Sequence, residues 1–290
     1  MRHPIRVPAR LVSCLAVVLA LTACEKGIDK DAVDRKLQDI NVIDESDLNE
    51  VMLSNSDPNE SVNYFRRATA SKPDRIDLQR GLAVSLIRAK RPTEAVSAWK
   101  RVLEMDEAAP ADKVELADAY IRNDQWDKAE ETLHSVPPTH ETFRRYRLEA
   151  MIADGKQQWQ KADSFYETAV GLTTTPSGVM NNWGYSKLSR GDYAGAEKLF
   201  VQAIRQDSDL FTAKNNLVLA RGAQGNYTLP VVPMSQGERA QLLYTLGLSA
   251  VKRGDVETGK GLFRDAIETH PQYFEAAVRS LSALENNAAN

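Results

Sequence analysis

The chain has 290 residues, of which 42% are hydrophobic, 27% charged and 7% aromatic, and its formal net charge at pH 7 is −3. This composition is typical of a soluble protein, and no shift along the chain is large enough to divide it into two domains. The slightly acidic balance argues against a general binder of nucleic acid or anionic lipid, because such proteins normally present a basic surface.

The start of the chain, residues 1–23, differs from the rest. Arg2, Arg6 and Arg10 precede an apolar run, Leu11 to Leu21, that is too short to span a bilayer as a helix of about 20 residues. The pattern predicts a secretory signal segment, residues 1–23, that is removed from the mature protein. Its removal takes away three arginines and no acidic residue, which further disfavours a nucleic-acid partner.

The predicted signal segment ends in Leu21-Thr22-Ala23-Cys24, which resembles the lipobox of bacterial lipoproteins. The resemblance implies that Cys24 is lipidated and anchors the protein, each buried CH₂ contributing about 0.8 kcal/mol. The other cysteine, Cys14, would leave with the signal, so no disulfide is expected. The alternative is an ordinary signal peptide or an uncleaved anchor.

The residue after Cys24 bears on the choice of membrane. In enterobacterial lipoproteins an Asp at this position favours retention at the inner membrane, whereas this chain has Glu25. We therefore expect the periplasmic face of the outer membrane rather than the inner membrane. Residues 24–43 are rich in acidic side chains and predict a lipidated cysteine followed by a tether; the alternative is a short helix packed on the segment that follows.

From residue 44 onward a small residue returns at a nearly constant interval. The series consists of four alanines, Ala95, Ala129, Ala162 and Ala196. Each is followed by a larger apolar residue four positions later and an apolar one seven positions later, which is the spacing of one helix face. These residues are Trp99, Leu133, Tyr166 and Phe200 at the first offset and Val102, Val136, Ala169 and Ala203 at the second.

The interval of the alanine series is about 34 residues, which is the period of the tetratricopeptide repeat (TPR), a stacked pair of helices. The residues Trp183, Gly184, Tyr193, Ala196, Phe200 and Ala203 resemble the TPR consensus closely, with a weaker copy around Phe65 and a strong one around Phe263. The resemblance implies an all-α fold, a right-handed superhelical α-solenoid of TPR helix pairs. We expect about five pairs and one unpaired helix at 44–227, and a final pair with a capping helix at 237–290.

The alanine series is interrupted once, between Ala196 and Gly259. A helix is predicted from Phe211 to Gln224, but its partner is replaced by a segment with two prolines and several β-branched residues, which predicts an extended loop at 228–236. A new helix is expected near Gln236, with Ser235 as its N-cap and Glu238 completing a capping box.

The predicted loop carries four apolar side chains, Leu229, Val231, Val232 and Met234. Two interpretations stay open. The loop packs over the place left by the missing helix, or its apolar residues are a site that docks on a partner chain.

Two pairs of asparagines, Asn181-Asn182 and Asn215-Asn216, are separated by the same interval as the alanines. In TPR proteins the first helix of each pair lines a concave groove, and an asparagine there can bond both the N–H and the C=O of an extended peptide. The resemblance therefore implies peptide contacts by these residues, and Tyr185, four residues past Asn181, shares their helix face. The alternative is that one asparagine of each pair caps or bridges neighbouring helices.

No catalytic or metal site is expected from the sequence. His134, His140 and His270 match no spacing of metal ligands, and no phosphate-binding, metalloprotease or nucleophile-elbow motif is present. Trp126 and Tyr193, each three residues before a repeat alanine, are interpreted as packing residues. We therefore predict a protein without cofactor, metal or small-molecule substrate.

A lipid-anchored TPR array resembles the lipoproteins that serve envelope machines, especially the TadD-type lipoproteins of tight-adherence (Flp) pilus systems. The segment from Asn215 to Gly225 carries this narrower resemblance. It implies a non-enzymatic, pilotin-like assembly factor whose partner is an outer-membrane secretin or another pilus or secretion subunit. The alternatives are a type IV pilus pilotin, a factor for outer-membrane barrel assembly, or an adaptor for peptidoglycan or polysaccharide export.

Overall fold

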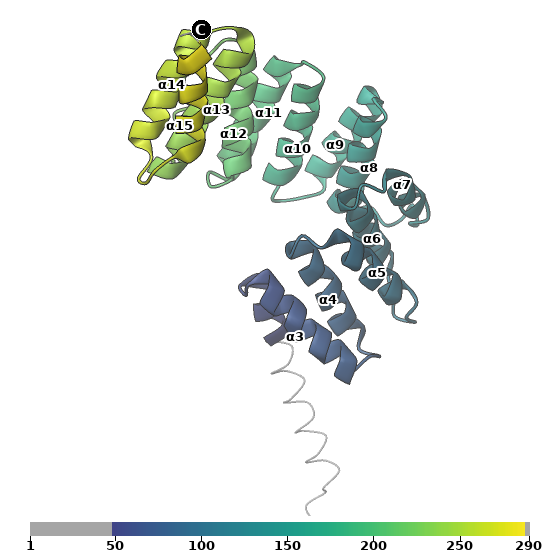
Figure 1. Ribbon diagram of the computed structural model, residues 1–290. Coiled ribbons are helices and arrows are strands. Elements are labelled where there is room, and N and C mark those ends of the chain that lie inside the picture. Colours follow the sequence, from purple (N-terminus) through teal and green to yellow (C-terminus); the bar gives the residue numbers. More distant parts are fainter. Residues whose placement is uncertain (1–47, 288–290) are drawn as a thin grey trace, which may run out of the picture. The chain divides into compact units, whose positions relative to one another are not determined.

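The computed structural model describes residues 48–287, which are helical apart from the connecting turns and loops, with no strand among them (Figure 1). The predicted signal segment, Cys24 and the tether at 24–43 lie outside these residues. The chain forms two compact units, which divide between Arg91 and Pro92.

The first unit contains a short helix at residues 48–54, followed by α3 (Pro58–Ser71) and α4 (Ile76–Arg88). Helix α3 begins after Asp57, whose side chain accepts hydrogen bonds from the backbone N–H of Asn59 and Glu60, and such a cap satisfies donors that a helix start leaves unpaired. The two helices meet closely at Gly81, where a Cβ atom would lie 2.3 Å from the Phe65 ring.

The second unit is a series of antiparallel helix pairs. Its elements are α5 (Pro92–Leu103), α6 (Pro110–Arg122), α7 (Trp126–His134), α8 (Phe143–Gly155), α9 (Trp159–Gly171), α10 (Ser177–Ser189), α11 (Tyr193–Gln206), α12 (Phe211–Ala223), α13 (Gln236–Arg253), α14 (Val256–Thr269) and α15 (Glu275–Asn287). Helices α6/α7, α8/α9, α10/α11 and α13/α14 pair through short turns; the first three pairs pack on one another in order, and α12 packs between α11 and α13. This stacking of helix pairs is the architecture of an α-solenoid.

The alanine series lies inside the packed helix pairs, as predicted. Ala95, Ala129, Ala162 and Ala196 have no exposed surface, and the large residues four positions later are at most 2% exposed. The need for a small residue is sharpest at Gly184 of α10, where a Cβ atom would lie 2.6 Å from the Phe200 ring of α11. Gly247 of α13 meets the Phe263 ring of α14 at the same distance.

The predicted interruption is also present. Helix α12 is followed by a non-helical segment and then directly by α13, and Ser235 and Glu238 form the predicted capping box. We call residues 226–234 the bridging loop. Its residue Pro230 lies one repeat interval after Ala196, where the next member of the alanine series would fall, and it is buried although it belongs to no helix.

The bridging loop packs on the array. Leu229 and Met234 contact a cluster formed by Val218, Leu242 and Leu246, and Val232 contacts the cluster around Phe200. Lys214 of α12, only 2% exposed, donates from Nζ to the Pro233 carbonyl at 2.8 Å and to Glu238 Oε1 at 3.2 Å. The structure thus favours packing for three of the four loop residues.

Val231 is the exception among the four predicted loop residues, because its side chain is fully exposed. Of the four residues predicted as a partner site, it alone is free of packing contacts that would have to be broken. A docking surface made of all four is therefore not available in this conformation, for the physical reason that Leu229, Val232 and Met234 fill the space of the missing helix.

A charged cluster joins α9 to α10 and orients the latter helix. Asp163 of α9 accepts hydrogen bonds from Trp183 Nε1 at 2.6 Å, Lys187 Nζ at 3.0 Å and Arg190 at 2.5 Å. Burial by itself would raise the pKa of the Asp163 carboxyl, but these three donors outweigh it and hold the pKa below its ordinary value. Helix α10 is therefore fixed at its middle and at its C-terminal end.

Candidate functional site

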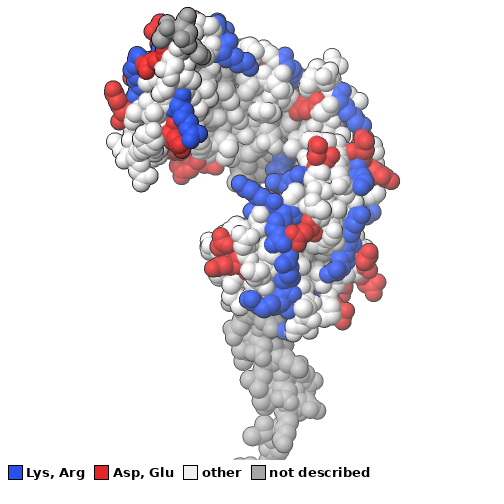
Figure 2. All heavy atoms as spheres, in the orientation of Figure 1, with Lys and Arg blue, Asp and Glu red and all other residues white. Residues whose placement is uncertain are grey.

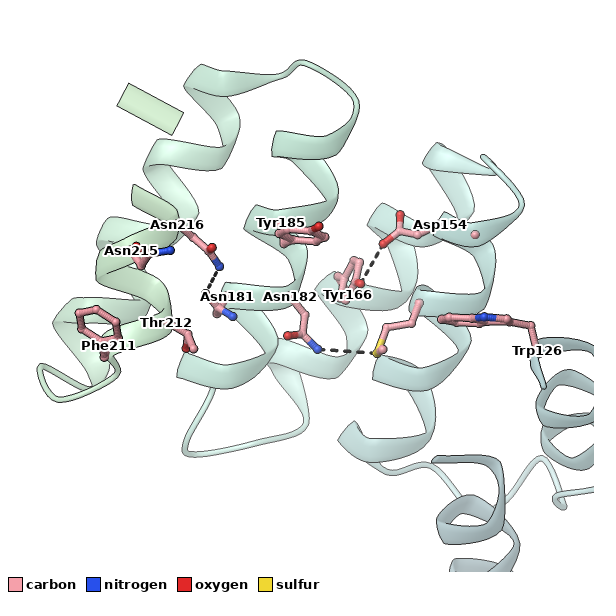
Figure 3. A pocket seen from close by; sticks show the side chains of 12 residues that line it. Trp126, Asp154, Tyr166, Asn181, Asn182, Tyr185, Phe211, Thr212, Asn215 and Asn216 are labelled. Atoms are coloured by element: carbon pink, nitrogen blue, oxygen red, sulfur yellow. Dashed lines mark hydrogen bonds between the residues drawn. The ribbon is translucent and has the colours of Figure 1, made fainter. Parts of the chain in front are cut away.

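A groove of about 480 Å³ runs along α8, α10 and α12 of the second unit (Figure 3). Its lining residues come from five helices and are largely uncharged: Trp126, Met151, Asp154, Gly155, Tyr166, Asn181, Asn182, Tyr185, Phe211, Thr212, Asn215 and Asn216. All five residues predicted for a peptide groove are among them. Their contact with a ligand stays a prediction, but the structure brings them to one surface.

The asparagines hold neighbouring helices together. Asn216 Nδ2 donates to Asn181 Oδ1 at 3.0 Å, which links α12 to α10 (Figure 3). Asn215 Oδ1 accepts from Thr245 Oγ1 of α13 at 2.8 Å, and Asn182 Nδ2 contacts the Met151 sulfur of α8 at 3.7 Å. The bridging role left open by the sequence is therefore present.

Each of these carboxamides uses only one of its two ends. Within the described part of the chain, no hydrogen bond engages Nδ2 of Asn181 or Nδ2 of Asn215. Both side chains are only half-buried, and both line the groove. Bridging and ligand contact are thus compatible, because a carboxamide can donate and accept at the same time.

Aromatic rings line the groove alongside the amides. The Tyr185 side chain is 57% exposed, and Figure 3 shows its ring between the Asn181–Asn216 pair and the Tyr166–Asp154 pair. Phe211 lies at the start of α12, packed against the cluster around Leu242. Exposed aromatic surface beside unengaged amides is suited to a ligand that offers both apolar and hydrogen-bonding groups.

Trp126 corrects an interpretation made from the sequence. Its repeat position predicts a packing residue, but its side chain is 37% exposed and lines the groove. Its indole Nε1 donates to Asp124 Oδ1 at 2.8 Å. The reason is its position as the first residue of α7, where only part of the ring is covered by the helix stack.

Asp154 is the one ionisable carboxylate among the lining residues. It accepts hydrogen bonds from Tyr166 Oη at 2.9 Å (Figure 3) and from Ser186 Oγ at 2.6 Å. Burial raises the pKa of the Asp154 carboxyl, and these two hydrogen bonds offset the rise only in part. The groove lining therefore carries a carboxylate, each of whose oxygens already accepts one hydrogen bond from a neighbouring helix.

Charged side chains gather next to the groove rather than in it. On α6 and α8, Arg122 pairs with Asp118 at 2.6 Å and Arg144 with Glu115 at 2.8 Å. Figure 2 shows charged side chains of both signs over this part of the second unit, and a mostly uncharged surface over α10 and α12. The ligand that suits the groove itself is accordingly uncharged.

The sequence does not single out Met151, Asp154, Phe211 or Thr212. A signal for one of them is present, because Met151 lies one repeat interval before Tyr185 and so occupies the same repeat position. Thr212 and Asn215 are three residues apart and share a helix face. For Asp154 no such signal exists, since its role depends on Tyr166 and Ser186 from neighbouring helices.

Over residues 48–287, no group of three or more His, Cys, Asp or Glu side chains is placed to hold a metal ion. Among the helices of the same range, none combines the length and the apolar character needed to cross a membrane.

Models of known protein families match the repeats of this chain. Models of the tetratricopeptide repeat match residues 53–113, 86–152 and 241–273. The chain thus carries tetratricopeptide repeats on both sides of the bridging loop, and its fold is that of a TPR array. No curated protein matches the sequence.

Solved structures share the fold at low sequence identity. The Cut9–Hcn1 structure of the APC/C matches with a TM-score of 0.57 and 12% identity over 81% of this chain, which spans only 48% of the matched chain. PilW, described as a widely conserved type IV pilus biogenesis factor, matches at 0.53 with 16% identity over 71% of this chain and 98% of its own. PilF of Pseudomonas aeruginosa matches at 0.50 with 14% identity over 72% and 97%.

Proposed function

We propose that the protein is a membrane-anchored TPR scaffold that binds a protein partner through the groove, and that it acts as a pilotin-like assembly factor for a Flp/Tad pilus secretion system. The observation that carries the proposal is the groove itself. It combines unengaged asparagine donors on α10 and α12 with the exposed aromatic surface of Tyr185.

The pilus assignment is supported by two features of different kinds. The segment Asn215 to Gly225 resembles the TadD-type lipoproteins, and the fold resembles PilF and PilW. Likeness at 14–16% identity speaks for the fold alone, so the proposed partner, an outer-membrane secretin or another pilus subunit, is a matter for experiment.

The anchor is proposed from Leu21-Thr22-Ala23-Cys24. We expect the Cys24→Ala protein to leave the membrane fraction, because it lacks the thiol that carries the lipid. Ser54→Ala, a change of an exposed residue in the first unit, serves as the control and should fractionate with the membranes. Continued membrane fractionation of the Cys24→Ala protein would exclude lipidation as the main anchor.

The assembly role is tested by deleting the gene and measuring secretin multimers and surface pili. We expect fewer multimers in the outer membrane and loss of pili, with recovery on expression of the intact chain. Unchanged amounts of secretin multimers and surface pili in the deletion strain would refute the pilotin role. Copurification of synthases or export proteins in place of a secretin would instead support the second candidate, an adaptor for another envelope machine.

A further inference from the structure

We propose that the groove recognises a proline-rich segment of the partner in the polyproline II conformation. This inference rests on the proposed function, since it names the chemistry of the ligand that the same groove would bind. It follows from the spacing of the unengaged amides, the aromatic surface beside them and a lining whose single carboxylate, Asp154, is already hydrogen-bonded.

The spacing is set by the stacking of the helices. The hydrogen bond between Asn216 and Asn181 shows that α10 and α12 are direct neighbours. Packed helix axes lie roughly 8–10 Å apart. Asn181 and Asn215 hold the same position in successive repeats, so their Nδ2 donors recur at about this interval along the groove.

A regular backbone must present its carbonyl groups at the same interval to meet both donors. Polyproline II rises about 3.1 Å per residue with three residues per turn, so carbonyls three residues apart point the same way about 9 Å apart. In a β-strand, carbonyls that point the same way are two residues and about 6.7 Å apart, which is shorter than one helix spacing of roughly 8–10 Å. In an α-helix the carbonyls are already bonded within the helix.

The chemistry of the lining agrees with this conformation. Polyproline II leaves its carbonyls without internal bonds, and proline supplies acceptors without N–H donors. The unengaged Nδ2 groups of Asn181 and Asn215 are donors that match such acceptors. The exposed ring faces of Tyr185 and Trp126 give apolar surface for proline rings, as in other grooves that bind proline-rich segments.

The charge of the groove lining also favours a proline-rich ligand. A ligand with acidic side chains would find no cation among the lining residues, and both oxygens of the one lining carboxylate, Asp154, already accept hydrogen bonds from Tyr166 and Ser186. A segment of prolines and small residues requires no charged partner. Its rigid backbone also loses little conformational entropy on binding, which favours affinity in a shallow groove.

The test uses a fluorescein-labelled peptide of repeated Ala-Pro-Pro units, about twelve residues long, and the purified full-length protein in detergent. We expect binding with a Kd on the order of 100 µM in fluorescence polarisation. Two peptides serve as controls: the all-D enantiomer, whose helix has the opposite hand, and repeated Ala-Thr-Thr units, which favour the extended strand. Both should bind at least about tenfold more weakly.

Matched variants test whether the peptide binds in the groove. Asn181→Asp with Asn215→Asp keeps the two oxygens that bridge the helices but removes both unengaged donors, and we expect binding to fall about tenfold or more. Gln202→Glu with Asn226→Asp adds the same two charges at exposed positions outside the lining and should leave binding unchanged. Tyr185→Ala should also weaken binding several-fold, whereas Tyr185→Phe keeps the ring and should not.

Each contrary result has a definite meaning. Equal binding of the enantiomer, or no effect of the asparagine variants, would overturn the inference. Tighter binding of the Ala-Thr-Thr peptide would overturn the polyproline conformation while leaving a peptide groove intact. If no peptide bound, the inference would fall, and the proposed assembly role would still be judged by secretin multimers in the deletion strain.

Discussion

The side chain of Asn216 donates from Nδ2 to Oδ1 of Asn181 at 3.0 Å, so that one carboxamide of α12 is bonded to one of α10. The two residues are 35 positions apart in the chain, and the bond joins α10, the first helix of the α10/α11 pair, to the unpaired helix α12. It leaves Asn181 Nδ2 unengaged on a surface that is open to a ligand. The same contact therefore stabilises the stack and orients a binding group.

The hydrogen bond between Asn216 and Asn181 predicts that Asn181 contributes to stability through its side-chain oxygen. We expect Asn181→Ala to lower the free energy of unfolding by about 1 kcal/mol, because the hydrogen bond from Asn216 is lost. Asn181→Asp should cost less, since its oxygen still accepts from Asn216. Urea unfolding followed by circular dichroism measures both; equal losses for the two variants would show that the bond does not carry the effect.

The close approach of α10 and α11 predicts a cost for any side chain at Gly184. A Cβ atom there would lie 2.6 Å from the Phe200 ring, so Gly184→Ala should destabilise the protein by about 1–3 kcal/mol. At Gly261 of α14 an added Cβ meets nothing within 4 Å. Gly261→Ala should therefore stabilise the protein by up to about 1 kcal/mol through helix propensity. Thermal unfolding that ranked the two variants in the opposite order would contradict this packing.

The buried position of Lys214 predicts that the stability of the bridging loop depends on this one cation. We expect Lys214→Met to speed amide hydrogen exchange at Val232, whose N–H donates to the Pro230 carbonyl, because the loop loses the bond to the Pro233 carbonyl while the methionine still fills the apolar space. Lys198→Met, at an exposed position of α11, is the control and should leave exchange unchanged. Equal protection in both variants would mean that apolar packing alone holds the loop.

The Asp163 cluster predicts a dependence of stability on pH. The pKa of this carboxyl is lower in the folded state than in the unfolded chain, whose ordinary value is about 3.9. Its contribution is therefore fully present above that value and is lost as the pH falls through the folded-state pKa. We expect about 1–2 kcal/mol, given three donors and partial exposure to water.

The measurement is the free energy of unfolding in urea between about pH 2 and pH 7, compared between the wild type and Asp163→Asn. The variant should be less stable at neutral pH, and the difference should shrink at the acid end of the range. Asp209→Asn, at an exposed position between α11 and α12, is the control for loss of a charge. A constant difference across the range would exclude titration of Asp163 as the cause.

The repeat spacing by itself determined the helices, their pairing and the buried face of each. The reason is local, because a helix that must pack on the next at every repeat needs a small residue and a large one at fixed offsets, as at Ala196 and Phe200. The break in the series and the capping box at Ser235 were predictable for the same reason, since proline and capping side chains act on the backbone beside them.

The tertiary structure alone decided what these residues do across helices. It showed that Asn181 and Asn216 bond to each other, that Lys214 is buried under the bridging loop and that Trp126 faces the groove. None of these contacts follows from spacing, because each joins side chains of different helices whose distance depends on how the pairs stack. The alanine series defined a scaffold, and only the stacking of its pairs showed which surface of that scaffold has unused donors.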